Sequence, residues 1–146
     1  MKLPPGIGCS IKGMARDLQL GSAVTDHVSG EKFEVYLVEE GMVRCDWTEG
    51  ATISPADAQA ALDAFVTLTA NVATPVLVDL RNVAAVDREA RRMFASAPMA
   101  NRQALLVGSP LSRTLGTFFV KLSRPAMPVK IFDDEAAAIA WLRVGG

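Results

Sequence analysis

Histidine and cysteine counts limit the chemistry open to this 146-residue chain. It has one histidine, His27, and two cysteines, Cys9 and Cys45, which lie far apart in the sequence. Nucleophilic catalysis of the Ser-His-Asp or Cys-His kind needs a histidine held beside the nucleophile, and His27 lies in a glycine-rich stretch. Neither cysteine lies at a predicted helix N-terminus, so we expect neither thiol to have a lowered pKa. The same counts exclude a zinc finger and a disulfide scaffold, so we expect no metal and no cofactor.

Arginine is the charged residue with the most informative distribution. Residues 31–80 carry 2 basic and 9 acidic side chains, whereas residues 81–128 carry 8 basic and 2 acidic ones. Arginine suits recognition of carboxylates and phosphates, because its guanidinium donates two parallel hydrogen bonds. The candidate interaction site is an aspartate followed by three arginines on one side of a predicted helix: Asp87, Arg88, Arg91 and Arg92.

Three interpretations of these arginines are open. They could form a solvated outer face that pairs with the acidic half of the same domain. They could instead dock an acidic protein segment or a second subunit. Nucleic-acid binding is the weakest alternative, because no aromatic side chains lie between the arginines and the chain's formal net charge is −1. We therefore predict a protein partner or a homodimer, and no nucleic-acid partner.

A second candidate site lies at the start of the next predicted helix. Ser109, Ser112 and Arg113 surround the first turn of that helix, where free backbone amides can attract an anion. A plain serine N-cap followed by Pro110 explains the same residues. The preceding Gly108 does not belong to a P-loop, because the spacing and the lysine of that motif are missing. An anion or ligand site and a simple helix cap are thus both open.

The same helix carries two apolar stripes. We expect the first stripe to face the core, and it comprises Leu111, Leu115, Phe118 and Leu122. The second stripe runs beside it and includes Gly116, Phe119 and Val120, with a glycine that permits close approach. This second stripe either packs against a neighbouring helix of the same domain or meets a second subunit. It is therefore our candidate self-association site.

Strands and helices that alternate along the chain must position these residues. The predicted strands cover residues 33–38, 42–48, 75–80, 103–107 and 129–132, and the predicted helices are 54–70 and three others that begin at Asp87, Ser109 and Asp133. The order β-β-α-β-α-β-α-β-α predicts an α/β fold with a mixed, mostly parallel sheet, an N-terminal β-hairpin and four helices. We expect a single domain over residues 31–146, preceded by a flexible N-terminal arm over residues 1–30 that lies outside the core.

Several segments resemble the SpoIIAA-like, or STAS, family of anti-sigma-factor antagonists. They are PVLVDLRNVAAVD at 75–87, ALLVGSPLS at 104–112 and PVKIFDDEAAAIAWL at 128–142, so that the similarity covers about residues 33–143. The resemblance implies a SpoIIAA-like fold and a role in protein interaction. In the antagonists the residue after the aspartate is a serine that a partner kinase phosphorylates. That position is Arg88 here, so the phosphorylation switch does not carry over.

The first functional hypothesis is a non-enzymatic, regulatory or protein-interaction module of STAS-like type without the phosphorylatable serine. The alternative is a small-molecule binding domain that holds an apolar or anionic ligand near Ser109. A third hypothesis, an enzyme built on Asp79, Asp87 and Arg81, is the least favoured, and we expect no enzymatic activity. Because no secretory signal or membrane-spanning stretch is found, we expect a cytoplasmic protein with no membrane partner.

Overall fold

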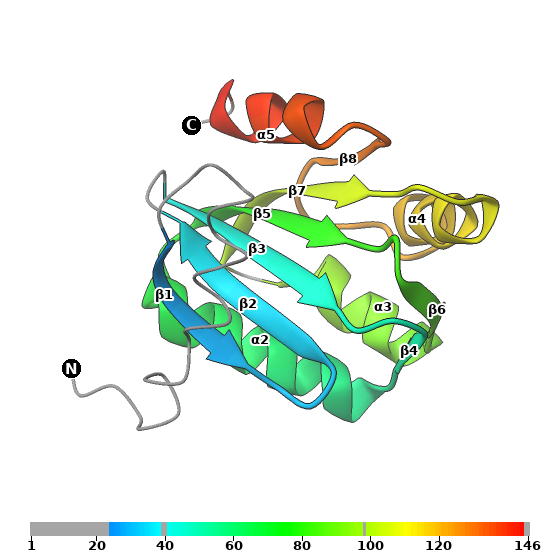
Figure 1. Ribbon diagram of the computed structural model, residues 1–146, viewed down its shortest axis with the longest axis horizontal. Helices are drawn as coiled ribbons and strands as arrows, with labels where there is room; N and C mark the ends of the chain where they lie inside the picture. The colour runs from blue at the N-terminus through cyan, green and yellow to red at the C-terminus, as the bar shows by residue number, and fades with distance from the viewer. Residues whose placement is uncertain (1–23, 39–40, 98, 145–146) are drawn as a thin grey trace.

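The computed structural model describes residues 24–38, 41–97 and 99–144. This part of the chain forms a mixed α/β fold with eight strands and four helices, as Figure 1 shows. The strands are β1 (Val24–Ser29), β2 (Phe33–Val38), β3 (Met42–Trp47), β4 (Ala51–Ile53), β5 (Thr74–Asp79), β6 (Val83–Val86), β7 (Ala100–Leu106) and β8 (Val129–Phe132). The helices are α2 (Pro55–Thr69), α3 (Arg88–Ala95), α4 (Pro110–Leu122) and α5 (Glu135–Val144).

The central sheet is mostly parallel, as predicted. Its six strands follow the order β1-β2-β3-β5-β7-β8. The first three strands pair antiparallel, and β3, β5, β7 and β8 pair parallel. The short strands β4 and β6 form a separate parallel pair beyond the ends of β3 and β5. The predicted hairpin is β2–β3, and Gly41 provides the left-handed backbone, with φ of 78°, that its turn requires.

Helices cover the two faces of the sheet unequally. Helices α2, α3 and α4 lie on one face, and α5 alone lies on the other (Figure 1). Alternate side chains of each strand point to opposite faces, so Val35 and Val43 belong to the larger core under the three helices, and Tyr36 belongs to the smaller core under α5. Because one helix cannot cover the whole sheet, the α5 side leaves room for polar side chains.

The predicted capping signals start the helices. Ser54 and Asp57 form a reciprocal capping box at the start of α2, with Pro55 as the first helical residue. Asp87 caps α3 by accepting a 2.8 Å hydrogen bond from the backbone N–H of Glu89. For α5 the capping carboxylate belongs to Asp134, which accepts from the backbone N–H of Ala137 at 2.9 Å, and not to the predicted Asp133.

The predicted arm covers residues 1–30, and residues 1–23 lie outside the described part of the chain. For residues 24–29 the prediction was wrong, because they form β1 and pair with β2. His27 on this strand is buried, and its ring stacks on Tyr36 with the centroids 5.0 Å apart. A short edge strand such as β1 is stabilised by backbone hydrogen bonds to its neighbour. Because these bonds do not depend on side-chain type, the sequence of β1 shows little hydrophobic periodicity.

The core-facing side of α4 was also predicted wrongly. The buried residues are Ser112, Gly116 and Phe119, and Val120 is half-buried, whereas Leu111, Phe118 and Leu122 are exposed. A Cβ atom on Gly116 would lie 3.4 Å from Cδ1 of Ile131, so the helix backbone approaches β8 closely where the residues are small. Gly116, Phe119 and Val120 thus pack within their own domain, which is one of the two alternatives that the sequence left open for this stripe; self-association through them stays a prediction.

Candidate functional site

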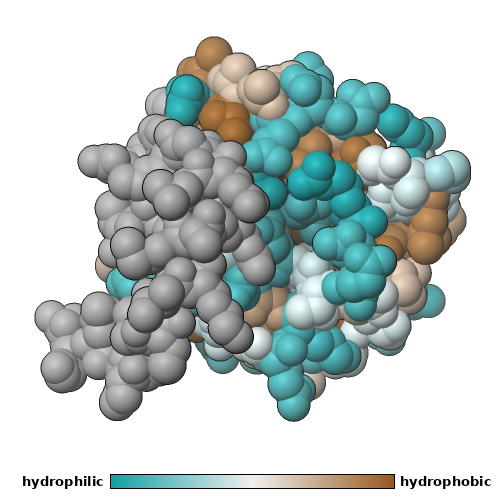
Figure 2. Space-filling model, in the orientation of Figure 1, coloured by the Kyte–Doolittle hydropathy of each residue, from teal (hydrophilic) through white to brown (hydrophobic). Residues whose placement is uncertain are grey.

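A cleft of about 600 Å³ opens where the parallel strands β3 and β5 end. Four segments line it, namely the β1–β2 hairpin, the ends of β3 and β5, and the first turn of α5. Figure 2 shows mainly hydrophilic residues over this part of the surface. In open α/β sheets, ligands commonly bind beyond the carboxyl ends of the strands. The position and volume of this cleft make it a candidate binding site.

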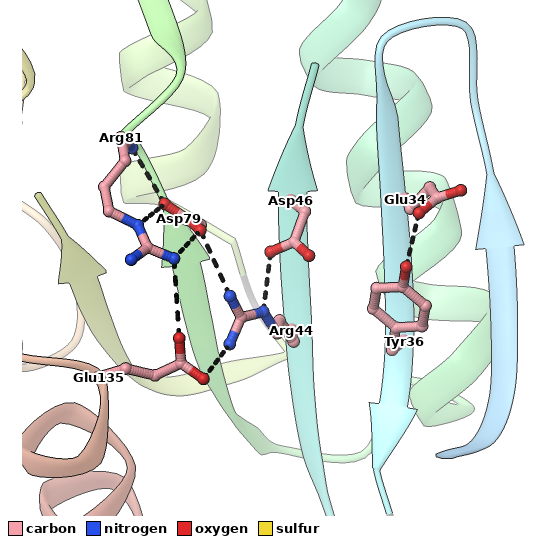
Figure 3. Close-up of polar contacts among 7 residues, drawn as sticks. All are labelled: Glu34, Tyr36, Arg44, Asp46, Asp79, Arg81 and Glu135. Carbon is pink, nitrogen blue, oxygen red and sulfur yellow. Dashed lines mark hydrogen bonds and ion pairs between the residues drawn. The ribbon is translucent and has the colours of Figure 1, made fainter. Parts of the chain in front are cut away.

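A closed ring of ion pairs forms one wall of the cleft (Figure 3). Arg44 on β3 contacts Asp79 at the end of β5, with Nη2 3.3 Å from Oδ2, and Glu135 on α5, with Nη1 2.9 Å from Oε2. Arg81 closes the ring, with its Nη2 2.8 Å from Asp79 Oδ2 and 3.6 Å from Glu135 Oε1. Arg44 Nε also donates to Asp46 Oδ1 at 2.8 Å. The ring thus joins α5 to the two middle strands.

The strand register explains why Arg44 is needed. Asp46 and Asp79 are direct partners across the parallel β3–β5 pair, and two carboxylates in that position repel each other. Arg44 lies two residues before Asp46 on the same face of β3 and contacts both carboxylates. Its side chain is only 7% exposed, so the charge pairs are largely shielded from solvent. Such pairs are costly to break, because the remaining charges stay buried without a partner.

The ring stabilises the charged forms of Arg44, Asp79 and Arg81. Burial alone would raise the pKa of Asp79, but hydrogen bonds from Arg81 and the charge of Arg44 outweigh burial and lower it. Burial would lower the pKa of Arg44, but Asp46 and Glu135 outweigh burial and raise it. The hydrogen bond to Asp79 is the main cause of the raised pKa of Arg81. These side chains therefore act as fixed charges at neutral pH.

A glycine at the end of β7 makes room for Arg81. A Cβ atom on Gly108 would lie 3.1 Å from both Cγ and Cδ of Arg81, which is closer than an ordinary contact. The Arg81 stem therefore lies directly against the Gly108 backbone. Its guanidinium can then form two parallel hydrogen bonds to the Asp79 carboxylate, at 3.0 and 2.8 Å.

Beside the ring, β1 and β2 contribute a second polar group. The Tyr36 hydroxyl donates to Glu34 Oε1 at 2.5 Å, and Figure 3 shows this pair on the strand next to Arg44. His27 Nε2 lies 3.0 Å from the Ser29 hydroxyl and 4.0 Å from Glu34 Oε2. Contrary to the sequence expectation, His27 is held in a defined position, beside residues that line the cleft.

Sequence reasoning did not find this cleft, although a signal was present. Strands β3 and β5 are otherwise apolar, yet β3 places Arg44 and Asp46 on alternate positions and β5 ends at Asp79. Charges on the same face of two neighbouring buried strands must pair with each other or line a cavity. The least favoured hypothesis had named Asp79, Arg81 and Asp87. The structure brings the first two together, and Asp87 caps α3 instead.

The candidate interaction residues lie on the other side of the molecule. Asp87, Arg88 and Arg92 are exposed on α3, and Arg91 is half-buried with its Nη1 3.4 Å from the Ser123 hydroxyl. Arg92 forms an ion pair with Glu89 of its own helix, at 3.5 Å. Among the described residues, no ion pair joins these arginines to the acidic segment 31–80.

The residues of the predicted anion site form a helix cap. Ser109 Oγ accepts from the Ser112 backbone N–H at 3.1 Å, and Ser112 Oγ accepts from the Ser109 backbone N–H at 2.9 Å. Ser112 is fully buried, and Arg113 turns away to pair with Asp133 at 3.3 Å. The cap interpretation therefore accounts for both serine hydroxyls, and the three side chains do not converge on a common point.

In the part of the chain that the structure describes, no group of three or more His, Cys, Asp and Glu side chains is arranged to hold a metal ion. Burial, with smaller effects from Asp46 and Asp79, raises the pKa of the Cys45 thiol well above its usual value, which keeps that thiol protonated. Cys9 lies outside the described residues. No helix among the described residues is long and apolar enough to span a membrane.

Comparison with known proteins agrees with this fold. A solved structure from Shewanella loihica PV-4, an uncharacterised DUF3478-family protein with a SpoIIAA-like fold, matches 83% of this chain and 94% of its own, at 14% identity and a TM-score of 0.51. This similarity confirms the SpoIIAA-like fold that the sequence predicted. No curated protein matches the chain.

Two further similarities concern the family. A protein of unknown function from Arthrobacter sp. FB24 is 37% identical to this chain, over 74% of this chain and 96% of its own, with a TM-score of 0.31. The model of a domain of unknown function, DUF7793, matches residues 36–144. The chain therefore belongs to the DUF7793 family.

Proposed function

We propose that this protein is a non-enzymatic protein-interaction module of STAS-like type, which binds an acidic partner segment on α3. The observation that carries the proposal is that, where the structure describes the chain, the acidic segment 31–80 does not pair with the arginines of α3. Asp46 pairs with Arg44, Asp57 pairs with Lys32 at 2.8 Å, and Asp79 pairs with Arg44 and Arg81. Arg88 and Arg92 of α3 consequently face solvent.

The chemistry of α3 supports this assignment. Arg88 and Arg92 are exposed at i and i+4, a spacing that puts two guanidinium groups on one side of the helix. Arg92 forms an ion pair with Glu89 on this side of the helix, but each of the two side chains is 58% exposed, so the pair contributes little stability. Guanidinium groups that are not needed for folding are available to carboxylates of a partner.

The comparison with the antagonist family is an analogy based on the shared fold. In the antagonists, the position after the aspartate carries the phosphorylated serine, and in this chain it carries Arg88. Because Arg88 has no hydroxyl group to phosphorylate, a kinase cannot change the charge of α3 at this position. We propose, accordingly, an interaction that does not depend on a kinase.

Reversal of charge on α3 tests the proposal. Affinity capture from a lysate of the source organism is compared for wild type, the double variant R88E/R92E and the matched control K130E, which changes an exposed cation on the α5 side of the sheet. We expect specific prey, identified by mass spectrometry and enriched in acidic segments, to be retained by wild type and K130E and lost with R88E/R92E. Equal capture by all three proteins would reject the proposal.

A second candidate function is favoured by the cleft. Five carboxylates and two guanidinium groups line it, so that its formal charge is −3, and both guanidinium groups are already paired within the ring. A cleft of about 600 Å³ with this charge fits a small organic cation rather than the anionic ligand expected from the sequence. The test is a thermal-shift comparison of agmatine, putrescine and citrate. A rise in Tm with the amines alone supports this function, and no rise, or a rise with citrate, contradicts it.

A further inference from the structure

Helix α4 has an apolar side that is exposed to solvent. Leu111, Phe118 and Leu122 are 50%, 45% and 63% exposed, and they are spaced at i, i+7 and i+11, with the half-buried Leu115 at i+4. This spacing places all four on one side of the helix. We call these four residues the α4 stripe. At about 1.5 Å per residue the α4 stripe is about 16 Å long. Figure 2 shows hydrophobic residues at the edge of the molecule where α4 lies in Figure 1.

Basic residues flank the α4 stripe. Arg91 of α3 and Leu115 of the stripe line the same narrow apolar crevice, of about 40 Å³, between the helices and the sheet. The contact of Arg91 with Ser123 and a 2.8 Å hydrogen bond from the Ala126 N–H to the Ala95 carbonyl hold the end of α4 against α3. Lys121 and Arg124, at the end of α4, are exposed as well. The α4 stripe is thus exposed to solvent next to the basic helix α3, and the cations Lys121 and Arg124 lie at the end of α4.

The basic residues near the α4 stripe indicate which kind of partner could bind there. A second copy that packed symmetrically would place its own Arg88, Arg92 and Lys121 opposite the same cations, which is unfavourable. A partner that combines apolar side chains with carboxylates complements both parts of the surface. A helix presents apolar residues at i, i+4, i+7 and i+11 in a straight row of the required length, with acidic residues on either side.

We propose that the α4 stripe and the α3 arginines together bind an acidic amphipathic helix of a partner protein. This inference rests on the proposed function and deepens it, because it names the form of the partner segment. Apolar side chains of that helix lie on Leu111, Phe118 and Leu122, and its carboxylates reach the arginines of α3. The pairing explains why apolar side chains stay exposed near cations that, among the described residues, have no ion pair with the acidic segment 31–80.

Fluorescence anisotropy with designed peptides tests this inference. The probe is a labelled helical peptide with leucines at i, i+4, i+7 and i+11 and glutamates around them. Its controls are a scrambled peptide of the same composition and a peptide with lysine in place of glutamate. We expect the acidic amphipathic peptide to bind at least about tenfold more tightly than either control. If it does not, the inference is wrong.

Variants separate this inference from the proposed function. The triple variant L111S/F118S/L122S should weaken binding of the acidic peptide about tenfold or more, and K130E should leave it unchanged. Circular dichroism and a melting curve confirm that the triple variant is folded. If R88E/R92E weakens lysate capture but the triple variant changes neither capture nor peptide binding, the proposed function stands and this inference fails. Stripe-dependent binding to anionic vesicles without peptide binding, or stripe-dependent dimerisation in light scattering, also overturns it.

Discussion

Two groups of arginines in this protein have opposite surroundings. Arg44 and Arg81 lie in the cleft, where carboxylates from β3, β5 and α5 surround them. Arg88 and Arg92 lie on α3, where Arg92 forms an exposed ion pair with Glu89 of the same helix. The same residue type therefore serves two purposes. In the cleft it holds secondary-structure elements together, and on α3 it provides a charged surface that folding does not require.

The largest expected effect comes from removing a cleft arginine. Arg44→Met keeps most of the side-chain volume but leaves Asp46, Asp79 and Glu135 close together without their shared cation. We expect a loss of about 4 kcal/mol in the free energy of unfolding. The matched variant Arg88→Met should change it by less than about 0.5 kcal/mol. Urea denaturation measures both, and equal losses would show that the two groups of arginines do not differ as described.

A similar contrast applies to the two phenylalanines of α4. Phe119 is 6% exposed and Phe118 is 45% exposed. Phe119→Ala should cost about 3 kcal/mol, because it opens a cavity against the core. Phe118→Ala should cost less than about 1 kcal/mol. Thermal or urea unfolding of the two variants measures the difference, and the reverse order would restore the core-facing side that the sequence predicted.

A smaller effect is expected from Gly108→Ala. The new Cβ atom pushes on the stem of Arg81 and disturbs its paired hydrogen bonds to Asp79, which should cost about 1 kcal/mol. In a double-mutant cycle with Arg81→Ala the two costs should not add, because the alanine at position 81 removes the crowded atoms. Additive costs would show that Gly108 is needed for another reason.

The smallest effect concerns pH. Asp79 has a lower pKa in the folded protein than in the unfolded chain, so the unfolded chain takes up protons first as the pH falls. The stabilisation from Asp79 is present above the unfolded pKa of about 3.9 and is lost as the pH falls through the lower folded value. The gap in Tm between wild type and Asp79→Asn should therefore narrow between about pH 5 and about pH 2. A constant gap would contradict this assignment.

The sequence predicted the four described helices and five of the eight described strands, but it missed β1, β4 and β6 and predicted the exposed sides of the helices less well. Strand 129–132 has the predicted bounds, and the capping residues at Ser54, Asp87 and Ser109 start their helices as expected. These features depend on local signals. In contrast, the two apolar stripes of α4 have the same period, so periodicity could not decide between them. The decisive factor was the fit of Gly116 against Ile131, which is a contact between distant parts of the chain.

The cleft was missed for a related reason. Its ring consists of Arg44 on β3, Asp79 at the end of β5, Arg81 just after it, and Glu135 on α5. Glu135 follows Arg44 by 91 positions in the sequence. A short window of sequence, of the length of one strand or helix, cannot contain both Arg44 and Glu135. The α3 arginines were found because three of them lie within five consecutive residues. A site made by one helix is visible in the sequence, whereas a site made by a sheet needs the strand order as well.

The link between Arg44 and Glu135 also has a consequence for the order in which the protein is made. Glu135 emerges from the ribosome only after β3, β5 and β7 have been translated. Until then, Arg44 lacks one of its carboxylates, and the smaller core has no α5 to cover Leu77 and Leu106. A nascent chain that stops before residue 135 should therefore expose this face of the sheet to water and be more sensitive to proteases than a chain that includes α5.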